Sequence, residues 1–324
     1  YTKCAPLTNI LFHDDDSLLL DYNYEDGEKV EPLFYLPLLP LILVNGTKAI
    51  GTGYSSTIPN FNPLDIITKI KLFINNLNND KEAFYNLKLK PFYRGFQGTI
   101  EKVDEIRFQT IGILESFKST TKGIQKTIYR VTEIPIGESI DSFKTNLERL
   151  LEEKIIKNLK NYSTAEKVLF EFERHDLSRK PITIESLKLR SQLSLSNMVL
   201  IGENQQIQKY QTCDEIIERF IEKKMDLYSK RIKYILNQLH SRKTLLQEKA
   251  RFIQDVNDKK IILFQQAEET IERQLHEKQY KKLLDNSYEY LLSMPMKSMT
   301  QERIAKLKNE IKKIDNDIYH LSKT

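Results

Sequence analysis

The stretch VEPLFYLPLLPLILVNGTKAIGTGYSSTIPNFNP, residues 30–63, contains the features on which the prediction of the fold depends. Its proline-rich first half is followed by a glycine cluster, NGTKAIGTGYSST, at residues 45–57. Three of the chain's ten glycines lie in this cluster, and Ile50 stands directly before the last two. Because glycine-rich loops often hold phosphate groups against the backbone, the first question is whether this cluster binds a nucleotide.

The residues between and after the glycines argue against a nucleotide site. Gly46 and Gly51 are spaced as in the opening of a Walker A motif, but Thr52 and Gly53 stand where that motif has lysine and then serine or threonine. Without the lysine, the β- and γ-phosphates of a nucleotide lack their positive partner. Two interpretations remain: a tight turn whose glycines adopt positive φ, or a loop that approaches a large polyanion and presents Ile50 outward.

The composition excludes several classes of protein. Hydrophobic residues make up 40% of the 324 residues and charged residues 29%, and no apolar run approaches the roughly 18 residues that a membrane span requires. Two cysteines, Cys4 and Cys213, are too few for a disulfide framework and fit a reducing compartment. The net charge of +5 is compatible with a nucleic-acid partner but does not require one.

No motif in the sequence identifies a metal or catalytic site. The five histidines and two cysteines lack the spacing of a zinc site, and HExxH is absent. Asp14, Asp15 and Asp16 are consecutive, and three neighbouring carboxylates on an extended chain rarely converge on one ion. We expect a solvated acidic loop there.

The first two hundred residues are expected to have an α+β fold. Six of the ten prolines precede residue 64, which favours short strands and turns in that region. Further along, apolar residues recur at helical spacing in some segments and alternate as in strands in others. The expected elements are a helix at residues 64–77, a small antiparallel sheet at residues 98–135, a helix at residues 142–159 with Phe143, Leu147, Leu150 and Leu151 on one face, and a strand at residues 168–173.

The pattern changes after about Asp214, and glycine is absent from Glu203 onward. Apolar residues then recur in steps of three and four over two segments, which is the pattern of a coiled coil. The two segments predict a long antiparallel coiled-coil hairpin with a globular insert; two amphipathic helices on a shared core are the alternative. The repeating positions are Ile221, Met225, Tyr228, Ile232, Ile235, Leu239, Arg242 and Leu246, and then Ile304, Leu307, Ile311, Ile314, Ile318 and Leu321.

Residues 187–200, LKLRSQLSLSNMVL, combine basic and hydroxyl-bearing side chains. Phosphate groups of nucleic acids are contacted mainly by charged groups and by hydroxyl or amide hydrogen bonds. The segment is therefore a candidate for contact with a phosphate backbone, although a polar loop before a strand has the same composition.

Taken together, five segments resemble the DNA-binding and cleavage core of the eukaryotic-type type IIA DNA topoisomerases. They occur in the order that this family has, and they span nearly the whole chain. The pattern VEPxxYxPxLPxxLVNG, followed by xIGTGxSxxIPxxNP, is highly specific. The segments are residues 25–66, 91–100 (PFYRGFQGTI), 129–137 (YRVTEIPIG), 189–200 (LRSQLSLSNMVL) and 290–295 (YLLSMP).

The resemblance implies a role for the glycine cluster and for the basic segment. In this family the corresponding loop approaches bent duplex DNA from the minor groove and inserts an isoleucine between base pairs, and such an apolar wedge kinks the duplex. Ile50 has that position, and Lys48 is expected to add a phosphate contact. The residues of the basic segment that are expected to bind DNA are Lys188, Leu189, Arg190, Ser191, Gln192, Ser194, Ser196 and Asn197.

The resemblance also implies a domain organisation. The expected fold is α+β, a small mixed α/β tower-like domain followed by a long antiparallel coiled coil with a helical C-gate insert. Residues 1–24 correspond to the end of the winged-helix domain, residues 25–210 to the tower domain that binds and bends DNA, and residues 211–324 to the coiled coil. The dimer contact of the C-gate is expected near residues 288–295.

The start of the chain decides which catalytic groups to expect. It reads YTKC without methionine, and we expect a piece of a longer protein. When the family pattern is followed backwards without gaps, Tyr1 falls on the phenylalanine two positions after the catalytic tyrosine. The nucleophile is therefore expected two residues before Tyr1, and no catalytic residue is assigned. Mg²⁺ and ATP are expected to serve the full-length enzyme, with neither bound by this segment.

The resemblance predicts an ATP-dependent enzyme that changes DNA topology by transient double-strand cleavage, strand passage and religation. Its expected partners are double-stranded DNA and a second copy of the chain, with no membrane. Its expected location is the nucleus for a cellular protein, or the cytoplasm or virion for one encoded by a large DNA virus. The alternatives are a non-catalytic DNA-bending or coiled-coil scaffold with the same fold and, more distantly, an unrelated nucleotide-binding protein. An Arg-Tyr-Ile sequence directly upstream would favour the enzyme.

Overall fold

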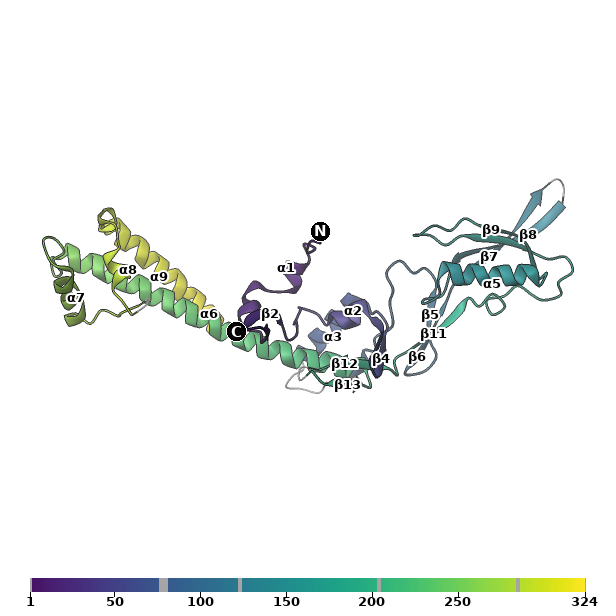
Figure 1. The fold of residues 1–324 in the computed structure, drawn as a ribbon, viewed down its shortest axis with the longest axis horizontal. Coiled ribbons are helices and arrows are strands. Elements are labelled where there is room, and N and C mark those ends of the chain that lie inside the picture. Colours follow the sequence, from purple (N-terminus) through teal and green to yellow (C-terminus); the bar gives the residue numbers. More distant parts are fainter. Residues whose placement is uncertain (1, 76–80, 122–123, 203–204, 284–285, 324) are drawn as a thin grey trace. The chain divides into compact units, whose positions relative to one another are not determined.

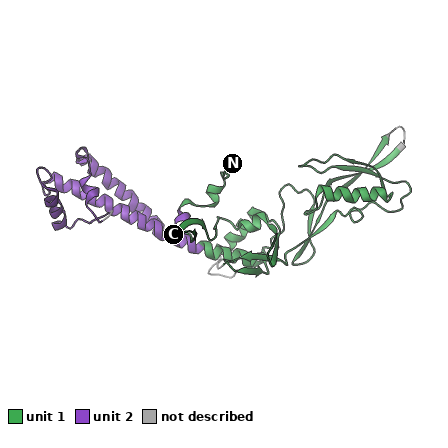
Figure 2. Ribbon diagram, viewed as in Figure 1, with its two compact units in different colours: residues 1–14, 20–224 green, residues 15–19, 225–324 purple. Residues whose placement is uncertain are grey.

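The computed structural model of the chain forms two compact units, which Figure 2 shows in different colours. The first unit comprises residues 1–14 and 20–224, and the second comprises residues 15–19 and 225–324. The division falls inside helix α6 (Cys213–Asn257) because the start of that helix joins the core of the first unit. The structure describes residues 2–75, 81–121, 124–202, 205–283 and 286–323.

No helix in these described ranges is both long enough and apolar enough to cross a membrane.

Short elements form the beginning of the chain, as the proline content predicts. Two left-handed residues, Asp26 (φ 50°) and Gly27 (φ 84°), join two antiparallel strands, which is the backbone of a type I′ hairpin turn. The elements are α1 (Thr8–Leu11), η1 (Asp14–Leu18), β1 (Tyr22–Glu25) and β2 (Glu28–Pro32).

The acidic run is not the solvated loop that the sequence predicts. It begins the short 3₁₀ helix η1, and Asp16 is buried. The Asp16 carboxylate accepts hydrogen bonds from Nε and Nη2 of Arg231 at 2.7 and 2.6 Å. Both residues belong to the second unit. A bidentate pair of this kind satisfies a carboxylate that has left solvent, and Asp16 therefore has a structural role.

The part of the first unit around the glycine cluster is a mixed α/β body (Figure 1). The predicted helix is present as α3, which ends at Asn75, while residues 76 and 77 lie outside the described part of the chain. Its apolar face packs in one core with α4, β4 and the start of α6. The elements are α2 (Leu41–Asn45), β3 (Thr47–Gly51), β4 (Tyr54–Ile58), α3 (Pro63–Asn75), α4 (Glu82–Asn86), β12 (Met198–Ile201) and β13 (Ile207–Tyr210).

A buried lysine joins this core to α6. Lys69 is fully buried, and its Nζ donates to the carbonyl oxygens of Phe84 and Leu87 at 2.8 and 2.5 Å. The same Nζ lies 2.8 Å from Oδ1 of Asp214 in the first turn of α6. Burial also raises the pKa of the neighbouring Cys213 thiol to about 12. An ammonium group can be buried only when such oxygens replace its water, so this network holds α3, α4 and α6 together.

Residues 98–135 contribute to two antiparallel sheets, whereas the sequence predicts one. The chain changes sheet at Gly112, whose N–H donates to the carbonyl of Leu189 at 3.0 Å. A Cβ at Gly112 would lie 2.3 Å from the carbonyl oxygen of Glu133, so the close approach of the two sheets requires glycine here. The first sheet has the order β11-β6-β5 and the second β7-β8-β10-β9.

Helix α5 packs against the second sheet (Figure 1). The strand predicted at residues 168–173 is confirmed as β10. The strands and the helix are β5 (Thr99–Lys102), β6 (Arg107–Ile111), β7 (Ile113–Thr121), β8 (Ile124–Glu133), α5 (Ile140–Glu152), β9 (Ile156–Asn161), β10 (Phe170–Arg174) and β11 (Arg190–Ser194).

Helix α5 is shorter than predicted, because a Schellman motif ends it. Lys154 adopts the left-handed conformation (φ 55°), its N–H donates to Leu151, and the N–H of Ile155 donates to Leu150. The chain then enters β9, where Ile156 is fully buried. Ile155 and Ile156 are adjacent β-branched residues, which favour a strand. The buried side of a helix could not hold both of their side chains. Leu151, predicted on the buried face, is exposed.

In the second unit, α9 packs against the later part of α6 (Figure 1). Their shared core includes Leu246 and Ile253 from α6 and Leu307 and Ile314 from α9. Nζ of Lys243 also lies 2.6 Å from Oδ1 of Asp315. The helices of this unit are α6 from Met225 onward, α7 (Glu268–Glu277), α8 (Glu289–Leu292), η2 (Met296–Ser298) and α9 (Gln301–Ser322).

The apolar repeat of α6 is divided between two cores. Ile221 belongs to the core of the first unit, while Leu239 and Leu246 contact α9. Met225 and Arg242 are exposed. A heptad pattern depends only on neighbouring residues, so it predicts one continuous apolar stripe along α6. Helix α9, with 22 residues against 45 in α6, is too short to cover the whole stripe.

The insert between α6 and α9 has a core of its own. Tyr288, Tyr290 and Leu291 are buried in it, and the hydroxyl of Tyr290 donates to the carbonyl of Lys281 at 2.6 Å. The sequence predicts a contact with a second chain near residues 288–295. These three side chains are buried within the chain, and the contact with a second chain stays a prediction.

Candidate nucleic-acid interface

The glycine cluster forms a β-hairpin, where the sequence suggests a loop. Strands β3 and β4 pair in register from Thr47 opposite Ile58 to Gly51 opposite Tyr54. Thr52 and Gly53 make the connecting turn, and Gly53 supplies the positive φ of +85°. The β-branched and aromatic residues of the segment explain the strand conformation.

Ile50 lies next to the turn and is 92% exposed. Its backbone partner across the hairpin is Ser55. Single exposed apolar residues are common on proteins, but among the large apolar side chains of the described residues Ile50 has the highest exposed fraction. The hairpin therefore has the tight turn of the first interpretation of the cluster and the outward isoleucine of the second.

Gly46 anchors the other end of the hairpin. Its φ of 63° and ψ of −179° lie in a region that only glycine occupies readily. A Cβ there would lie 2.5 Å from Oδ1 of Asn60 and 2.6 Å from the carbonyl oxygen of Ile58. Substitution of Gly46 would therefore displace the base of the hairpin. This requirement explains one of the three glycines in the cluster without invoking a nucleotide.

The segment before β11 places Lys188 on the surface by a tight turn. The N–H groups of Leu187 and Lys188 donate to Thr183 and Glu185, and Lys188 has a left-handed backbone (φ 56°). The next residue, Leu189, is fully buried in the core beneath α5. The prediction that Leu189 contacts DNA is therefore wrong for its side chain, which instead fixes the backbone that presents its neighbours.

Arg190 is exposed but has a partner within the chain. Its Nη2 lies 3.4 Å from Oε1 of Glu185. The pKa of Glu185 is lowered first by its own backbone N–H, then by the Thr183 hydroxyl, and also by the charge of Arg190. A phosphate that bound Arg190 would have to share the guanidinium with this carboxylate.

The polar residues that follow lie along β11 and the turn after it. Gln192 and Ser196 are exposed, while Ser191, Ser194 and Asn197 are partly buried. The hydroxyls of Ser194 and Ser196 lie 2.8 Å apart and are hydrogen-bonded. The predicted contact residues therefore differ in exposure, with Gln192 and Ser196 the most accessible of these five.

Hydrogen bonds bring the two predicted segments together. Nδ2 of Asn197 donates to the carbonyl and to Oγ of Ser55, 142 positions away in the sequence, at 3.1 and 2.9 Å. The N–H of Thr57 donates to the carbonyl of Asn197 at 2.8 Å. The β3–β4 hairpin and residues 188–197 therefore form one surface, which we call the candidate surface.

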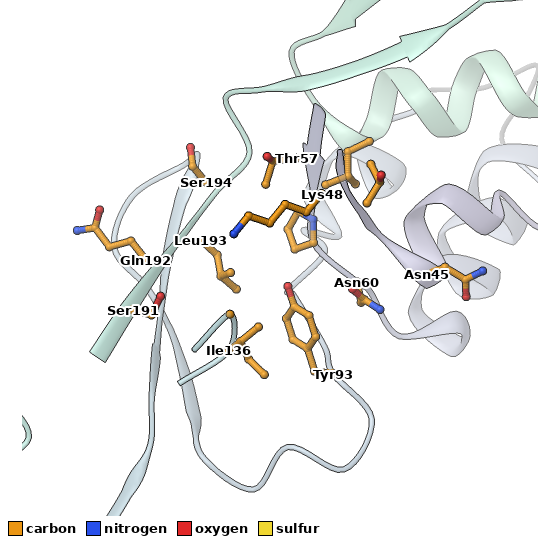
Figure 3. Close-up of a pocket in the computed structure, with 14 residues that line it drawn as sticks. Asn45, Lys48, Thr57, Asn60, Tyr93, Ile136, Ser191, Gln192, Leu193 and Ser194 are labelled. Atoms are coloured by element: carbon orange, nitrogen blue, oxygen red, sulfur yellow. The ribbon is translucent and has the colours of Figure 1, made fainter. Parts of the chain in front are cut away.

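A groove of about 320 Å³ runs between the hairpin and β11 (Figure 3). The Lys48 side chain extends across it toward β11. Besides Lys48, the residues that line it are mostly small or carry hydroxyl or amide groups: Asn45, Thr47, Thr57, Ile58, Pro59, Asn60, Tyr93, Ile136, Gly137, Ser191, Gln192, Leu193 and Ser194.

Sequence reasoning did not assign Tyr93, Asn60 or Ile136 to this site. The N–H of Phe92 donates to the carbonyl of Asn60 at 2.7 Å, which holds Tyr93 beside the hairpin base. Burial raises the pKa of the Tyr93 phenol, and the backbone N–H of Asn60 opposes that rise. Tyr93 and Ile136 lie in segments that matched the family pattern, so the pattern marked them as family residues but did not show where they meet.

The described residues include no group of three or more His, Cys, Asp or Glu side chains that could hold a metal ion. What the candidate surface offers is a groove lined by one lysine, Lys48, together with hydroxyl and amide groups and one outward apolar side chain. This chemistry suits a nucleic acid, which has a charged phosphate backbone outside and apolar stacked bases inside. Among the described residues that form the surface, no nucleophile is paired with a base.

Comparison with known proteins shows the family and the fold. The sequence model of the DNA gyrase/topoisomerase IV A-subunit family matches residues 1–324, and the chain belongs to that family. A DNA topoisomerase 2 from Invertebrate iridescent virus 6 is 35% identical over 324 residues, which cover 100% of this chain and 28% of that protein. One from Penicillium chrysogenum is 31% identical over 348 residues, covering 96% and 21%.

A solved structure shows the same fold. The crystal structure of the DNA-binding, cleavage and re-ligation domain of Plasmodium falciparum topoisomerase II matches with a TM-score of 0.79 and 28% identity. The match covers 99% of this chain and 46% of that chain. The chain spans only about a quarter of the length of the curated relatives it matches, at 28% and 21%.

Proposed function

We propose that this chain is the part of a type II DNA topoisomerase that binds and bends double-stranded DNA. The observation that carries the proposal is Ile50, an apolar side chain 92% exposed beside the turn of a hairpin. Burying such a side chain between bases is worth roughly 1.5–3 kcal/mol, and unstacking one base step costs a few kcal/mol. The free energy gained by burying Ile50 therefore nearly offsets the free energy that unstacking the base step costs.

The rest of the candidate surface supports contact with the backbone of the bent duplex. Lys48, Lys188 and Arg190 supply positive charge, and Ser191, Gln192, Ser194 and Ser196 supply hydrogen-bonding groups. Lys188 adopts a left-handed conformation that glycine and asparagine adopt more readily. Asparagine could therefore replace Lys188 without straining this turn, which isolates the charge of the side chain as the property to test.

The domain assignment follows the same proposal. Residues 1–24 would be the end of a winged-helix domain, residues 25–210 the tower domain, and residues 211–324 a coiled coil with a C-gate insert. The α6–α9 pair supports the coiled coil through its shared apolar core. We further propose that the two helices form an antiparallel, supercoiled pair.

A second copy of the chain is the proposed partner of the insert. Since Tyr288, Tyr290 and Leu291 are buried within the chain, we assign the contact to the exposed apolar residues Phe264 and Met296. A Phe264→Glu variant should sediment as a monomer at concentrations where the parent chain is a dimer. A dimer unchanged by this variant would move the contact elsewhere.

The chemistry belongs to the full-length protein. There, we propose, a tyrosine oxygen attacks a phosphodiester, forms a covalent phosphotyrosine and releases a DNA end. Mg²⁺ would stabilise the developing charge, and ATP would drive strand passage. We propose that the protein acts in the nucleus if it is cellular, or in the cytoplasm or virion if it is viral.

The experiment that tests the proposal measures DNA bending by energy transfer between dyes at the two ends of a duplex. Ile50→Ala should reduce the bend while leaving DNA binding and its salt dependence close to those of the parent chain, because every charged contact remains. Ile207, on β13, is also an exposed isoleucine of the same unit, and Ile207→Ala is the matched control. If Ile50→Ala bends DNA as sharply as the control, Ile50 is not a wedge.

A further inference from the structure

Asn197 was predicted to contact DNA, but its amide faces the hairpin. Nδ2 lies 3.1 Å from the carbonyl oxygen of Ser55 and 2.9 Å from its Oγ. The carbonyl can only accept hydrogen bonds, so the amide must present its NH₂ group there and not its oxygen. The NH₂ group is then engaged by Ser55. The remaining oxygen is an acceptor, which a phosphate would repel.

Ser55 is the residue opposite Ile50 in the hairpin. The hydrogen bonds of Asn197 therefore reach β4 directly across the ladder from the wedge. Two further bonds hold the next residues of β4: the N–H of Val199 donates to Oγ of the buried Ser56 at 3.3 Å, and the N–H of Thr57 donates to the carbonyl of Asn197. Three consecutive residues of the strand are thus attached to the segment 197–199.

The hairpin needs such an attachment to act on DNA. β3 and β4 form a sheet of two strands, and an isolated two-stranded hairpin is marginally stable in water. Because Ile50 is exposed, its side chain adds no packing that would stiffen the tip. Gly46 fixes the base of the hairpin, whereas the Asn197 amide holds the strand directly opposite the wedge.

We propose that Asn197 is a positioning residue for Ile50. It holds β4 so that the wedge meets the base stack with a fixed direction, and the free energy of insertion bends the DNA without first deforming the hairpin. This inference rests on the proposed function, since it assumes that Ile50 is the wedge.

The test is a double-mutant cycle on the full chain, with bending by energy transfer and affinity by titration as separate readouts. Asn197→Ala removes the amide and keeps the backbone bond to Thr57. It should lower the ratio of bent to unbent complexes roughly tenfold, as the loss of two neutral hydrogen bonds implies, with little change in affinity. In the Ile50→Ala background, Asn197→Ala should have no further effect on bending, because residues that act through one another are not additive.

Gln192→Ala is the matched control, because it removes an amide from the same groove without touching the hairpin bonds. If Asn197→Ala weakens binding as Gln192→Ala does and leaves bending unchanged, Asn197 is a direct DNA contact and the inference fails. It also fails if Asn197→Ala reduces bending equally with and without Ile50. If Ile50→Ala alone does not change bending, the proposed function falls, and the positioning role falls with it.

Discussion

The α6–α9 pair buries its apolar side chains between the helices, whereas the β3–β4 hairpin leaves Ile50 exposed. In the helix pair, Ile253 and Leu307 are fully buried against their partner helix. In the hairpin, Ile50 has almost no neighbour, and long-range hydrogen bonds hold the strands. An apolar side chain stabilises this fold where the chain covers it, whereas Ile50 contributes no such packing and is accessible for the proposed contact with DNA.

The largest expected effect concerns the buried network around Lys69, in the mixed α/β body that carries the hairpin. Its removal tests whether this body depends on buried contacts as strongly as the helix pair does. Lys69→Met leaves Asp214 and two carbonyl groups without their buried partner, and removal of one member of a buried pair costs about 3–5 kcal/mol. Chemical denaturation should show this loss of unfolding free energy. Lys71→Met, on the exposed side of the same helix, should change it by less than about 0.5 kcal/mol. Equal effects of the two variants would show that the network contributes little.

The contrast between the two regions predicts that truncating a buried apolar side chain costs far more stability than truncating an exposed one. Leu307→Ala should cost about 2–5 kcal/mol of unfolding free energy, because it leaves a cavity in the α6–α9 core. Ile50→Ala should change stability by less than about 0.5 kcal/mol, since no neighbour loses contact. Urea unfolding followed by the helical signal measures both. A marked loss of stability from Ile50→Ala would mean that the hairpin tip is packed, and the comparison would fail.

The smallest expected effect concerns charge on the candidate surface. Lys188→Asn keeps a residue that tolerates the left-handed backbone and removes one positive charge, so the slope of log affinity against log salt should fall by about 0.9. Lys154→Asn is the matched control, because Lys154 is also an exposed left-handed lysine, at the end of α5. Titrations at several salt concentrations measure both. The same change of slope in both variants would indicate a general effect of net charge and not a contact at Lys188.

Several features followed from the sequence because they depend on neighbours along the chain. The helical spacing at residues 64–77 predicted α3, and the repeats beyond Asp214 predicted the long helices. The glycines around Ile50 predicted a turn, and the structure confirms Gly53 at positive φ. The family resemblance, which the comparisons confirm, added the expectation that Ile50 faces DNA. Its contact with DNA stays a prediction.

The tertiary structure alone decided how distant residues share one surface. Leu189 and Arg190 are adjacent in the sequence, yet α5 and the second sheet bury the first and leave the second exposed. Likewise, nothing within ten residues of Asn197 indicates that its amide is bonded to Ser55, 142 positions away. Periodicity reports which face of an element is apolar, because that depends on the pitch of the backbone. Which polar groups meet across elements depends on how the sheets and helices pack, and only the folded chain determines that.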